Sequence, residues 1–580
     1  MVNLTINGRS VQVEEGTTIL EAAKKVNIDI PTLCFLKDIN EIGDCRMCVV
    51  EVEGRRGFAT SCIQKVEEGM VVKTNTPAVI EARRIVLDLI LSNHDRECLT
   101  CTRNGTCELQ KLAEEFYVDE IKYKGDRNKH EIDDKSPAIV RDFNKCILCR
   151  RCVATCKKLQ GIGAIDCTER GFASTISTYK NKSLNDVNCT FCGQCIEACP
   201  VGALKEKDAT AAVWRALRDE EKYVIVQTAP AVRVALGEEF GMEIGTNVKG
   251  KMVSALKHLG FDKVFDTNTG ADFTIVEEGT EFLDRFKNGG TLPMITSCSP
   301  GWVRYLELNY PELIPNLSTC KSPHQMFGAL IKSYYAEKNH IDPSKIFMVS
   351  VMPCIAKKFE ITRDNMSGAG YLDVDAVLTT RELARMIKQA HIDFIHLEDS
   401  GFDSPMGEAT GAAAIFGTTG GVMEAALRTV QEKLTGNHFE KLEYEAVRGQ
   451  EGIKRASVNM NGTEVKVVVA SGLKNAQIIM DEIKSGKADY QFVEIMACPG
   501  GCVMGGGQPI RSSKERASID IRAKRANALY DIDEKSIIRK SHENPVIKKI
   551  YEEYLGEAGG HRAHELLHTS YVEREKYKLD

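Results

Sequence analysis

The cysteines of this chain constrain its fold more than any other feature, because they are concentrated at one end and closely spaced. Sixteen of the 21 cysteines lie before residue 200. The N-terminus has neither the basic and apolar runs of a secretory signal nor a twin arginine, so we expect a cytoplasmic protein whose thiols stay reduced. Metal binding is therefore favoured over a disulfide framework. Thiolates that converge on one point are ligands of iron–sulfur clusters, and their spacing indicates how they group.

Length and charge exclude other classes of protein. A chain of 580 residues is too long for one core, which stops growing near ~250 to 300 residues, so several domains are expected. Lys plus Arg (76) nearly balance Asp plus Glu (82), for a net charge of -6, which argues against nucleic acid or an anionic membrane as a partner. No uninterrupted apolar segment reaches the ~20 residues of a membrane span.

Residues 1–78 have the pattern of a small ferredoxin-like domain. Apolar residues alternate on either side of Asn7-Gly8, a dipeptide that favours a type I′ hairpin. Thr18 and Glu21 form a capping box at the start of a helix. The cysteines that follow are Cys34, Cys45, Cys48 and Cys62. This order resembles the β-grasp fold of plant-type ferredoxins, although the first gap is longer, and it predicts one 2Fe-2S cluster.

Residues 79–125 contain a second group with a different spacing. Its members are His94, Cys98, Cys101 and Cys107. Three thiolates and an imidazole can hold a 4Fe-4S cluster, but spacing alone leaves open whether His94 is a ligand or a bystander. The pattern H-x3-C-x2-C-x5-C is similar to one in the large iron–sulfur subunit of respiratory complex I and in the iron-only hydrogenases. That resemblance favours His94 as a ligand.

Residues 138–209 contain two runs of the pattern C-x2-C-x2-C-x3-C, which is typical of bacterial two-cluster ferredoxins. In that pattern the fourth cysteine of each run crosses to the other cluster. The predicted sets are Cys146, Cys149, Cys152 and Cys199 for one 4Fe-4S cluster, and Cys189, Cys192, Cys195 and Cys156 for the other. Cys167 is left over and is interpreted as a small buried residue. Four clusters in series would form an electron conduit.

From residue 210 onward, short β-rich runs alternate with helical stretches, which indicates α/β architecture. Four of the runs, at 223–226, 293–296, 346–351 and 492–496, lead directly into loops with distinctive residues. Ligands of open α/β sheets lie beyond the carboxyl ends of strands, so these loops are expected to converge on one buried site. Glycine-dense stretches would let the backbone approach a bulky inorganic group. A phosphate-binding loop is the other interpretation, but no glycine-rich run ends in Lys-Ser/Thr.

Three motifs in this region carry a family resemblance. TSCSPGW (296–302), MPCIAKKFE (352–360) and EIMACPGGCVMGGGQP (494–509) resemble the signature motifs of the iron-only (FeFe) hydrogenases. The resemblance covers essentially the whole chain and implies a multidomain α/β and α+β protein. Residues 210–580 would form the catalytic domain, and 515–580 is similar to the family's small subunit, which wraps around it. The implied reaction is the reversible reduction of two protons to H2 at an H-cluster, a 4Fe-4S cubane joined to a di-iron unit that bears CO, cyanide and azadithiolate.

The resemblance also implies roles for individual residues. The cubane ligands would include Cys354, Cys498 and Cys502, with Cys502 as the bridge to the di-iron unit, and Lys357 would bind a cyanide. The pocket would be lined by Ala229, Pro230, Ala231, Ser322, Pro323, His324, Met352, Phe416 and Met496. The implied proton relay runs from the cluster to the surface through Cys298, Glu278, Ser318, Glu281 and Arg285. From the residues alone, Glu278 and Glu281 could instead belong to one solvated helix face.

The chain departs from the family at one metal-ligand position. The first motif has Cys298-Ser299 where the family has two cysteines, and a hydroxyl is a harder and much less acidic ligand than a thiol. Cys320 occupies a position where relatives carry alanine, and His324 replaces a glutamine. Three hypotheses follow. Cys320 replaces the missing ligand, Ser299 itself binds or leaves an open iron, or Cys298 binds and gives up its proton role.

The accessory segments resemble a particular class of hydrogenase. CRMCVVEVEGRRG (45–57) and FNKCILCRRC (143–152) are similar to segments in the catalytic subunits of NAD(P)-linked, often electron-bifurcating, multimeric hydrogenases. The expected partners are ferredoxin, flavin- and NAD(P)-binding subunits similar to those of complex I, and maturation proteins for the di-iron unit. A monomer that uses only ferredoxin is one alternative. A hydrogen sensor or an iron–sulfur carrier, which the serine at 299 would suit, is the other.

Overall fold

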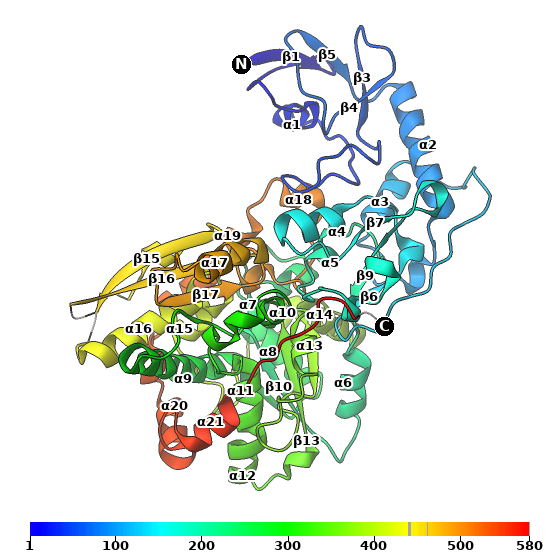
Figure 1. Ribbon diagram of the computed structural model, residues 1–580. Helices are drawn as coiled ribbons and strands as arrows, with labels where there is room; N and C mark the ends of the chain where they lie inside the picture. Colours follow the sequence, from blue (N-terminus) through cyan, green and yellow to red (C-terminus); the bar gives the residue numbers. More distant parts are fainter. Residues whose placement is uncertain (439–441, 461, 579–580) are drawn as a thin grey trace.

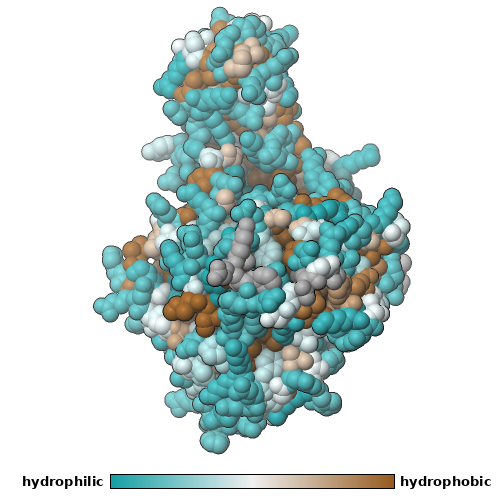
Figure 2. Space-filling view, turned by 90° about the vertical axis from the view of Figure 1, so that its left-hand side faces the viewer, coloured by the Kyte–Doolittle hydropathy of each residue, from teal (hydrophilic) through white to brown (hydrophobic). Residues whose placement is uncertain are grey.

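The computed structural model describes residues 1–438, 442–460 and 462–578. A ferredoxin-like region lies at one end of the molecule, the cysteine-rich segments follow it, and the rest of the chain forms a large body (Figure 1). In the space-filling view a narrow lobe rises from this broader body (Figure 2). None of the helices in the described residues is both long and apolar enough to cross a membrane.

The N-terminal region is a five-stranded sheet with the order β2-β1-β5-β3-β4. Asn7 and Gly8 have φ values of 46° and 78°, as a type I′ turn requires, and Thr18 and Glu21 cap the first helix reciprocally. The predicted hairpin and capped helix are therefore confirmed. The elements are β1 (Val2–Ile6), β2 (Arg9–Val13), α1 (Ile19–Lys25), β3 (Val49–Val52), β4 (Phe58–Thr60) and β5 (Met70–Lys73).

The cysteine-rich segments form small elements around buried sulfur atoms. A long helix, α2, leads into them from the N-terminal sheet, and β6 pairs with β9 in an antiparallel ribbon that spans both cysteine runs. The elements are α2 (Pro77–Asn93), α3 (Glu108–Glu115), β6 (Ile139–Arg141), α4 (Arg151–Ala154), β7 (Asp166–Thr168), β8 (Thr175–Ser177), α5 (Gln194–Ala198) and β9 (Leu204–Glu206).

The large body contains two four-stranded sheets, with the orders β11-β10-β13-β14 and β12-β17-β16-β15. The first sheet is wholly parallel, and in the second only β15 and β16 pair antiparallel. The strands are β10 (Tyr223–Thr228), β11 (Lys263–Asp266), β12 (Met294–Ile295), β13 (Ile346–Met352), β14 (Ala376–Thr379), β15 (Ile453–Met460), β16 (Thr463–Ser471) and β17 (Phe492–Met496). The four predicted runs are strands β10, β12, β13 and β17, but they are divided between two sheets.

Helices cover both sheets. They are α6 (Thr210–Leu217), α7 (Pro230–Arg233), α8 (Lys249–His258), α9 (Thr267–Asn288), α10 (Pro300–Asn309), α11 (Pro323–Leu330), α12 (Ala336–Lys338), α13 (Lys357–Glu360), α14 (Thr380–Gln389), α15 (Gly411–Ala414), α16 (Gly421–Thr435), α17 (Leu473–Lys484), α18 (Ser513–Arg516), α19 (Ile521–Glu534), α20 (Pro545–Ile550) and α21 (His561–Leu567). The long helix α9 packs against both α11 and α16, so it connects the two halves of the body.

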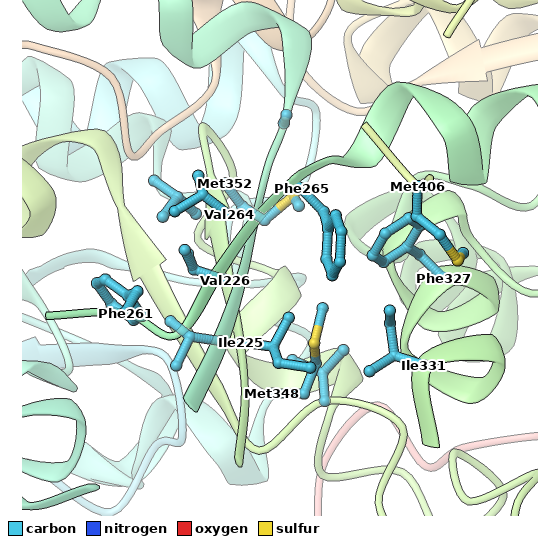
Figure 3. Close-up of a cluster of buried hydrophobic side chains, with 14 of the residues drawn as sticks. Ile225, Val226, Phe261, Val264, Phe265, Phe327, Ile331, Met348, Met352 and Met406 are labelled. Atoms are coloured by element: carbon cyan, nitrogen blue, oxygen red, sulfur yellow. The ribbon is translucent and has the colours of Figure 1, made fainter. Parts of the chain in front are cut away.

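The largest core lies on the first sheet. Ile225 and Val226 of β10 and Met348 of β13 are buried with Phe265 and Phe327, whose ring centroids are 5.9 Å apart (Figure 3). Each fully buried side chain of this size contributes roughly 1.5–3 kcal/mol. This core fixes the carboxyl ends of the parallel strands, and the loops that follow them are the ones predicted to hold the site.

Candidate active site and cluster sites

Strands from both sheets end at one cavity with an empty volume of about 850 Å³ and a mainly apolar wall. β10 leads to residues 229–231, β12 to Cys298 and Ser299, β13 to Cys354, and β17 to Cys498. The predicted residues in its wall are Ala229, Pro230, Ala231, Cys298, Ser299, Pro323, His324, Met352, Cys354, Lys357, Phe416, Met496, Cys498 and Cys502. Ser322 is not among the lining residues, although its buried Oγ has no hydrogen-bond partner among the described residues. The predicted convergence of the four loops is confirmed.

The sulfur atoms in this cavity fit a metal cluster. Burial raises the pKa of the Cys502 thiol to about 12 and also raises the pKa values of Cys354 and Cys498. In such surroundings the positive charge of a metal is what would hold these side chains as thiolates. The backbone closes tightly around them, since a Cβ on Gly505 would lie only 2.2 Å from the carbonyl oxygen of Pro353. The residues present therefore suit a bulky sulfur-bound group.

Ser299 and Cys320 lie in different places. Ser299 precedes α10 in the cavity wall, and its Oγ accepts a hydrogen bond from the backbone N–H of Ala497 at 3.2 Å. Cys320 is fully buried outside the wall, and its Sγ lies 3.8 Å from Oε2 of Glu281. The hypothesis that Cys320 replaces the missing cubane ligand gains no support, because its thiol contacts a carboxylate and does not line the cavity.

Lys357 is held at the cavity wall by a buried hydrogen-bonded chain. Its Nζ donates to Oε2 of Glu360 at 2.8 Å and to the carbonyl of Cys298 at 3.2 Å. Nε2 of His324 lies 2.5 Å from the same Glu360 oxygen, and its Nδ1 lies 2.9 Å from Oγ of Ser350. Burial, reinforced by the charge of Lys357, lowers the pKa of His324 to about 4, so the imidazole is neutral near pH 7. Although burial opposes it, the charge of Lys357 lowers the pKa of Glu360 to about 2.

Helix α9 carries the acidic residues of the predicted relay. Glu278 is fully buried, and burial followed by the charge of Glu281 raises the pKa of its carboxyl to about 8. Oγ of Ser318 donates to Oε2 of Glu281 at 2.9 Å, and Nη2 of Arg285 donates to Oε1 at 2.6 Å. Burial, and then the charge of Glu278, raises the pKa of Cys298. The interpretation of the two acids as one solvated helix face is wrong, because Glu278 has no exposed surface.

The cysteines of the two ferredoxin-like runs line two separate small cavities. One is lined by Cys146, Cys149, Cys152 and Cys199, and the other by Cys156, Cys189, Cys192 and Cys195. These are the two sets that the crossover pattern predicts. Cys192 also lines the large cavity of the body, so the second set directly adjoins it. Cys167 lies outside both sets and is half-buried, not buried as expected.

The four cysteines of the N-terminal region lie in two close pairs. Cys48 Sγ lies 3.3 Å from Cys62 Sγ, and the backbone N–H groups of Cys34 and Cys45 each point to the other's sulfur, at 3.3 and 3.5 Å. These four residues are the ones predicted to hold the 2Fe-2S cluster.

His94 is buried at the end of α2, and its Nδ1 has no hydrogen-bond partner in the part of the chain that the structure describes. Burial lowers the pKa of its imidazole to about 4, which leaves a neutral ring with a free lone pair. Cys98, Cys101 and Cys107 follow it and are all half-buried. A buried, neutral imidazole without a hydrogen-bond partner among the described residues fits a metal ligand.

Some lining residues were missed by the sequence reasoning. Pro300, Gly301, Pro353, Gly501 and Gly505 lie inside the three motifs, so their position beside the predicted residues was the available signal. Thr267 and Ala271 come from the first turns of α9, and their residue types carry no signal at all.

Comparisons with known proteins agree with this arrangement. Residues 222–506 match the family "Iron only hydrogenase large subunit, C-terminal domain", and residues 519–574 match "Iron hydrogenase small subunit". Residues 1–77 match a 2Fe-2S iron–sulfur cluster binding domain, and 83–122 match the "NADH-ubiquinone oxidoreductase-G iron-sulfur binding region". Residues 136–205 match the ferredoxin-like domain of NADH-quinone oxidoreductase subunit 3.

Similar proteins extend over the whole chain. The NADP-reducing hydrogenase subunit HndD of Solidesulfovibrio fructosivorans is 49% identical, over 99% of this chain and 100% of its own length. Iron hydrogenase 1 of Clostridium pasteurianum is 46% identical, over 98% of this chain and 100% of its own. An apo variant of the [FeFe]-hydrogenase HydA1 from Chlamydomonas reinhardtii is 44% identical, with a TM-score of 0.56 over 63% of this chain and 99% of that one. With its cysteine-lined cavity, its accessory cysteine sets and these similarities over its full length, the chain belongs to the iron-only (FeFe) hydrogenases.

Proposed function

We propose that this hydrogenase interconverts protons and H2 in the large cavity and exchanges electrons through four accessory clusters, one 2Fe-2S and three 4Fe-4S. The observation that carries the proposal is that Cys192 lines both an accessory cavity and the large one. Electron transfer by tunnelling requires closely spaced centres, and a residue shared by both walls places the two sites next to each other. The H-cluster, when bound, would supply the redox chemistry of H2.

The cluster ligands follow from the residues in the wall. Cys354, Cys498 and Cys502 would hold the cubane, and Ser299, which also lines the cavity, would take the fourth position. Cys298 would keep its proton role, because it lines the cavity and its carbonyl accepts from the Lys357 ammonium. Lys357 would bind a cyanide with an N–H that remains free after these two bonds.

The protons would move between the cavity and the surface along α9. The pKa of Glu278, about 8, keeps its carboxyl protonated, although neither of its oxygens has a hydrogen-bond partner among the described residues, and the Ser318 hydroxyl donates to Glu281. Arg285 fixes the Glu281 carboxylate at the outer end.

The experiment removes the thiol of Cys192, the residue that lines both cavities, and so interrupts the proposed electron route. In a Cys192→Ala variant, H2 evolution driven by reduced ferredoxin should fall at least tenfold, whereas the infrared spectrum of the cavity's metal group should persist. The matched control is Cys167→Ala, which removes a thiol that belongs to neither cavity. Equal activity of the two variants with ferredoxin would refute the proposed electron route.

We also propose that the chain works in a complex with flavin- and NAD(P)-binding subunits similar to those of complex I. Support comes from the matches of residues 83–122 and 136–205 to NADH oxidoreductase segments, and from the similarity to a subunit of an NADP-reducing hydrogenase. Maturation proteins would supply the di-iron unit. Affinity purification from the native host should recover flavoprotein subunits, and recovery of ferredoxin alone would favour the monomeric alternative.

A further inference from the structure

Another group of potential metal ligands lies apart from the cluster cysteines and shares Glu281 with the proton relay. Ligand atoms of Glu281, Cys320 and His568 all lie within 4.8 Å of one another. Cys320 and His568 are buried, and the Glu281 side chain is 14% exposed. Thiolate, imidazole and carboxylate are together the ligand types that Zn²⁺ and similar cations prefer.

The backbone fixes these residues against one another. Cys320 and His568 form an isolated antiparallel bridge, although 248 positions separate them in the sequence. The N–H of Lys321 donates to the carbonyl of Leu567 at 2.8 Å, and the N–H of Thr569 donates to the carbonyl of Thr319 at 2.7 Å. The site therefore does not depend on a mobile side chain to assemble.

His568 is already oriented as a metal ligand would be. Its Nε2 is 3.0 Å from Oε2 of Glu277, whose carboxylate also accepts from Tyr551 and from the N–H of Gly559. A carboxylate on one ring nitrogen fixes the tautomer and leaves the lone pair on the other nitrogen. That nitrogen, Nδ1, now accepts from the hydroxyl of Thr319 at 2.7 Å, a bond that rotation of the hydroxyl would release.

One member of this group lines another cavity. His568 lines an open surface cavity with an empty volume of about 1800 Å³, together with His564, whose ring stacks on it at a centroid distance of 4.6 Å. Lys321 also lines this cavity, but its charge is balanced by Asp373 at 2.7 Å. His568 is the proposed ligand that lines this cavity, so a cation would approach the group from this side.

We propose that Glu281, Cys320 and His568 form a binding site for a thiophilic divalent cation such as Zn²⁺, and that a bound cation blocks proton transfer through Glu281. Binding would form metal–sulfur, metal–nitrogen and metal–oxygen bonds and release the thiol proton of Cys320 to solvent, with a water molecule as fourth ligand. Ser318 donates to the same carboxylate oxygen that faces Cys320, so the cation would compete directly with the relay. Only this inhibitory effect rests on the proposed function.

The binding test uses the anaerobically purified holoprotein with one equivalent of Zn²⁺ and X-ray absorption at the zinc edge. The expected spectrum has one sulfur at about 2.3 Å and nitrogen or oxygen atoms at about 2.0–2.2 Å. Cys320→Ala should lose the sulfur contribution, whereas the matched control Cys167→Ala should keep it. His568→Gln should weaken Zn²⁺ binding at least roughly tenfold. Iron content measured before and after addition identifies any zinc that has displaced cluster iron.

The results separate the two parts of the proposal. A zinc–sulfur distance that persists in Cys320→Ala, or no bound zinc in the wild type, would overturn the site. With the site present, stoichiometric Zn²⁺ should slow H2 oxidation at least tenfold, a chelator should reverse this, and Cys320→Ala should resist it. Zinc bound through Cys320 with no effect on turnover would confirm the site and contradict the role of Glu281 in the relay.

Discussion

Replacing Glu278 by glutamine should stabilise the protein while it stops the proton relay. The buried carboxyl of Glu278 has a pKa of about 8 in the folded protein, compared with 4.5 as its ordinary value. Between these two values the folded state holds a proton that the unfolded state has released, so stability falls as pH rises. At about 1.4 kcal/mol per pH unit, this effect lowers the free energy of unfolding by about 3 kcal/mol near pH 7. Glutamine is neutral in both states and avoids this cost.

The assay compares thermal midpoints of wild type and Glu278→Gln by anaerobic calorimetry across pH. The two midpoints should coincide near about pH 4.5, and the variant should melt a few °C higher near about pH 7. Its turnover should fall about 10²–10⁴-fold, because an amide does not relay a proton as a carboxyl does.

The matched control is Glu281→Gln, the same change three residues along α9. Glu281 pairs with Arg285 at 2.6 Å, so this variant should lose stability at neutral pH. A Glu278→Gln protein that is destabilised as much as Glu281→Gln, or whose midpoint follows the wild type at every pH, would refute the reasoning.

Three further changes test other parts of the site. Ser299→Cys should alter the electron paramagnetic resonance spectrum of the oxidised active site, because a thiolate replaces a hydroxyl at the cubane; an unchanged spectrum would mean that position 299 does not touch iron. Glu360→Gln should lower the free energy of unfolding by about 3–5 kcal/mol, because the buried ammonium of Lys357 loses its carboxylate. An unaltered thermal midpoint would contradict that pairing. His94→Ala should lower the iron content by about four atoms per chain, and full iron occupancy would show that the imidazole is not a required ligand.

Local patterns were sufficient to predict much of this molecule. The hairpin at Asn7-Gly8, the capping box at Thr18 and the four strand ends follow from neighbouring residues, and so does the cysteine grouping, because cluster geometry dictates the spacing. The division of the strands between two sheets is a different matter. It depends on pairing between segments as distant as β12 and β17, which no local pattern encodes.

The placement of Cys320 shows which part of the arrangement the sequence could not predict. Its sequence neighbours line or adjoin the cavity, so proximity along the chain suggested a ligand position. The structure instead pairs Cys320 with His568, and that contact directs its thiol toward Glu281. A relation between residues so far apart is set by packing of the C-terminal segment, and only the folded chain reveals it.

The central claim is that the large cavity holds an H-cluster joined to the accessory clusters. Infrared spectroscopy of the anaerobically matured protein under H2 and then under inert gas tests it most directly. The account predicts CO and cyanide bands that shift reversibly between the two atmospheres, together with H2-dependent reduction of the accessory clusters. The absence of these bands from fully matured protein would contradict the claim, and bands that never respond to H2 would contradict the catalytic role.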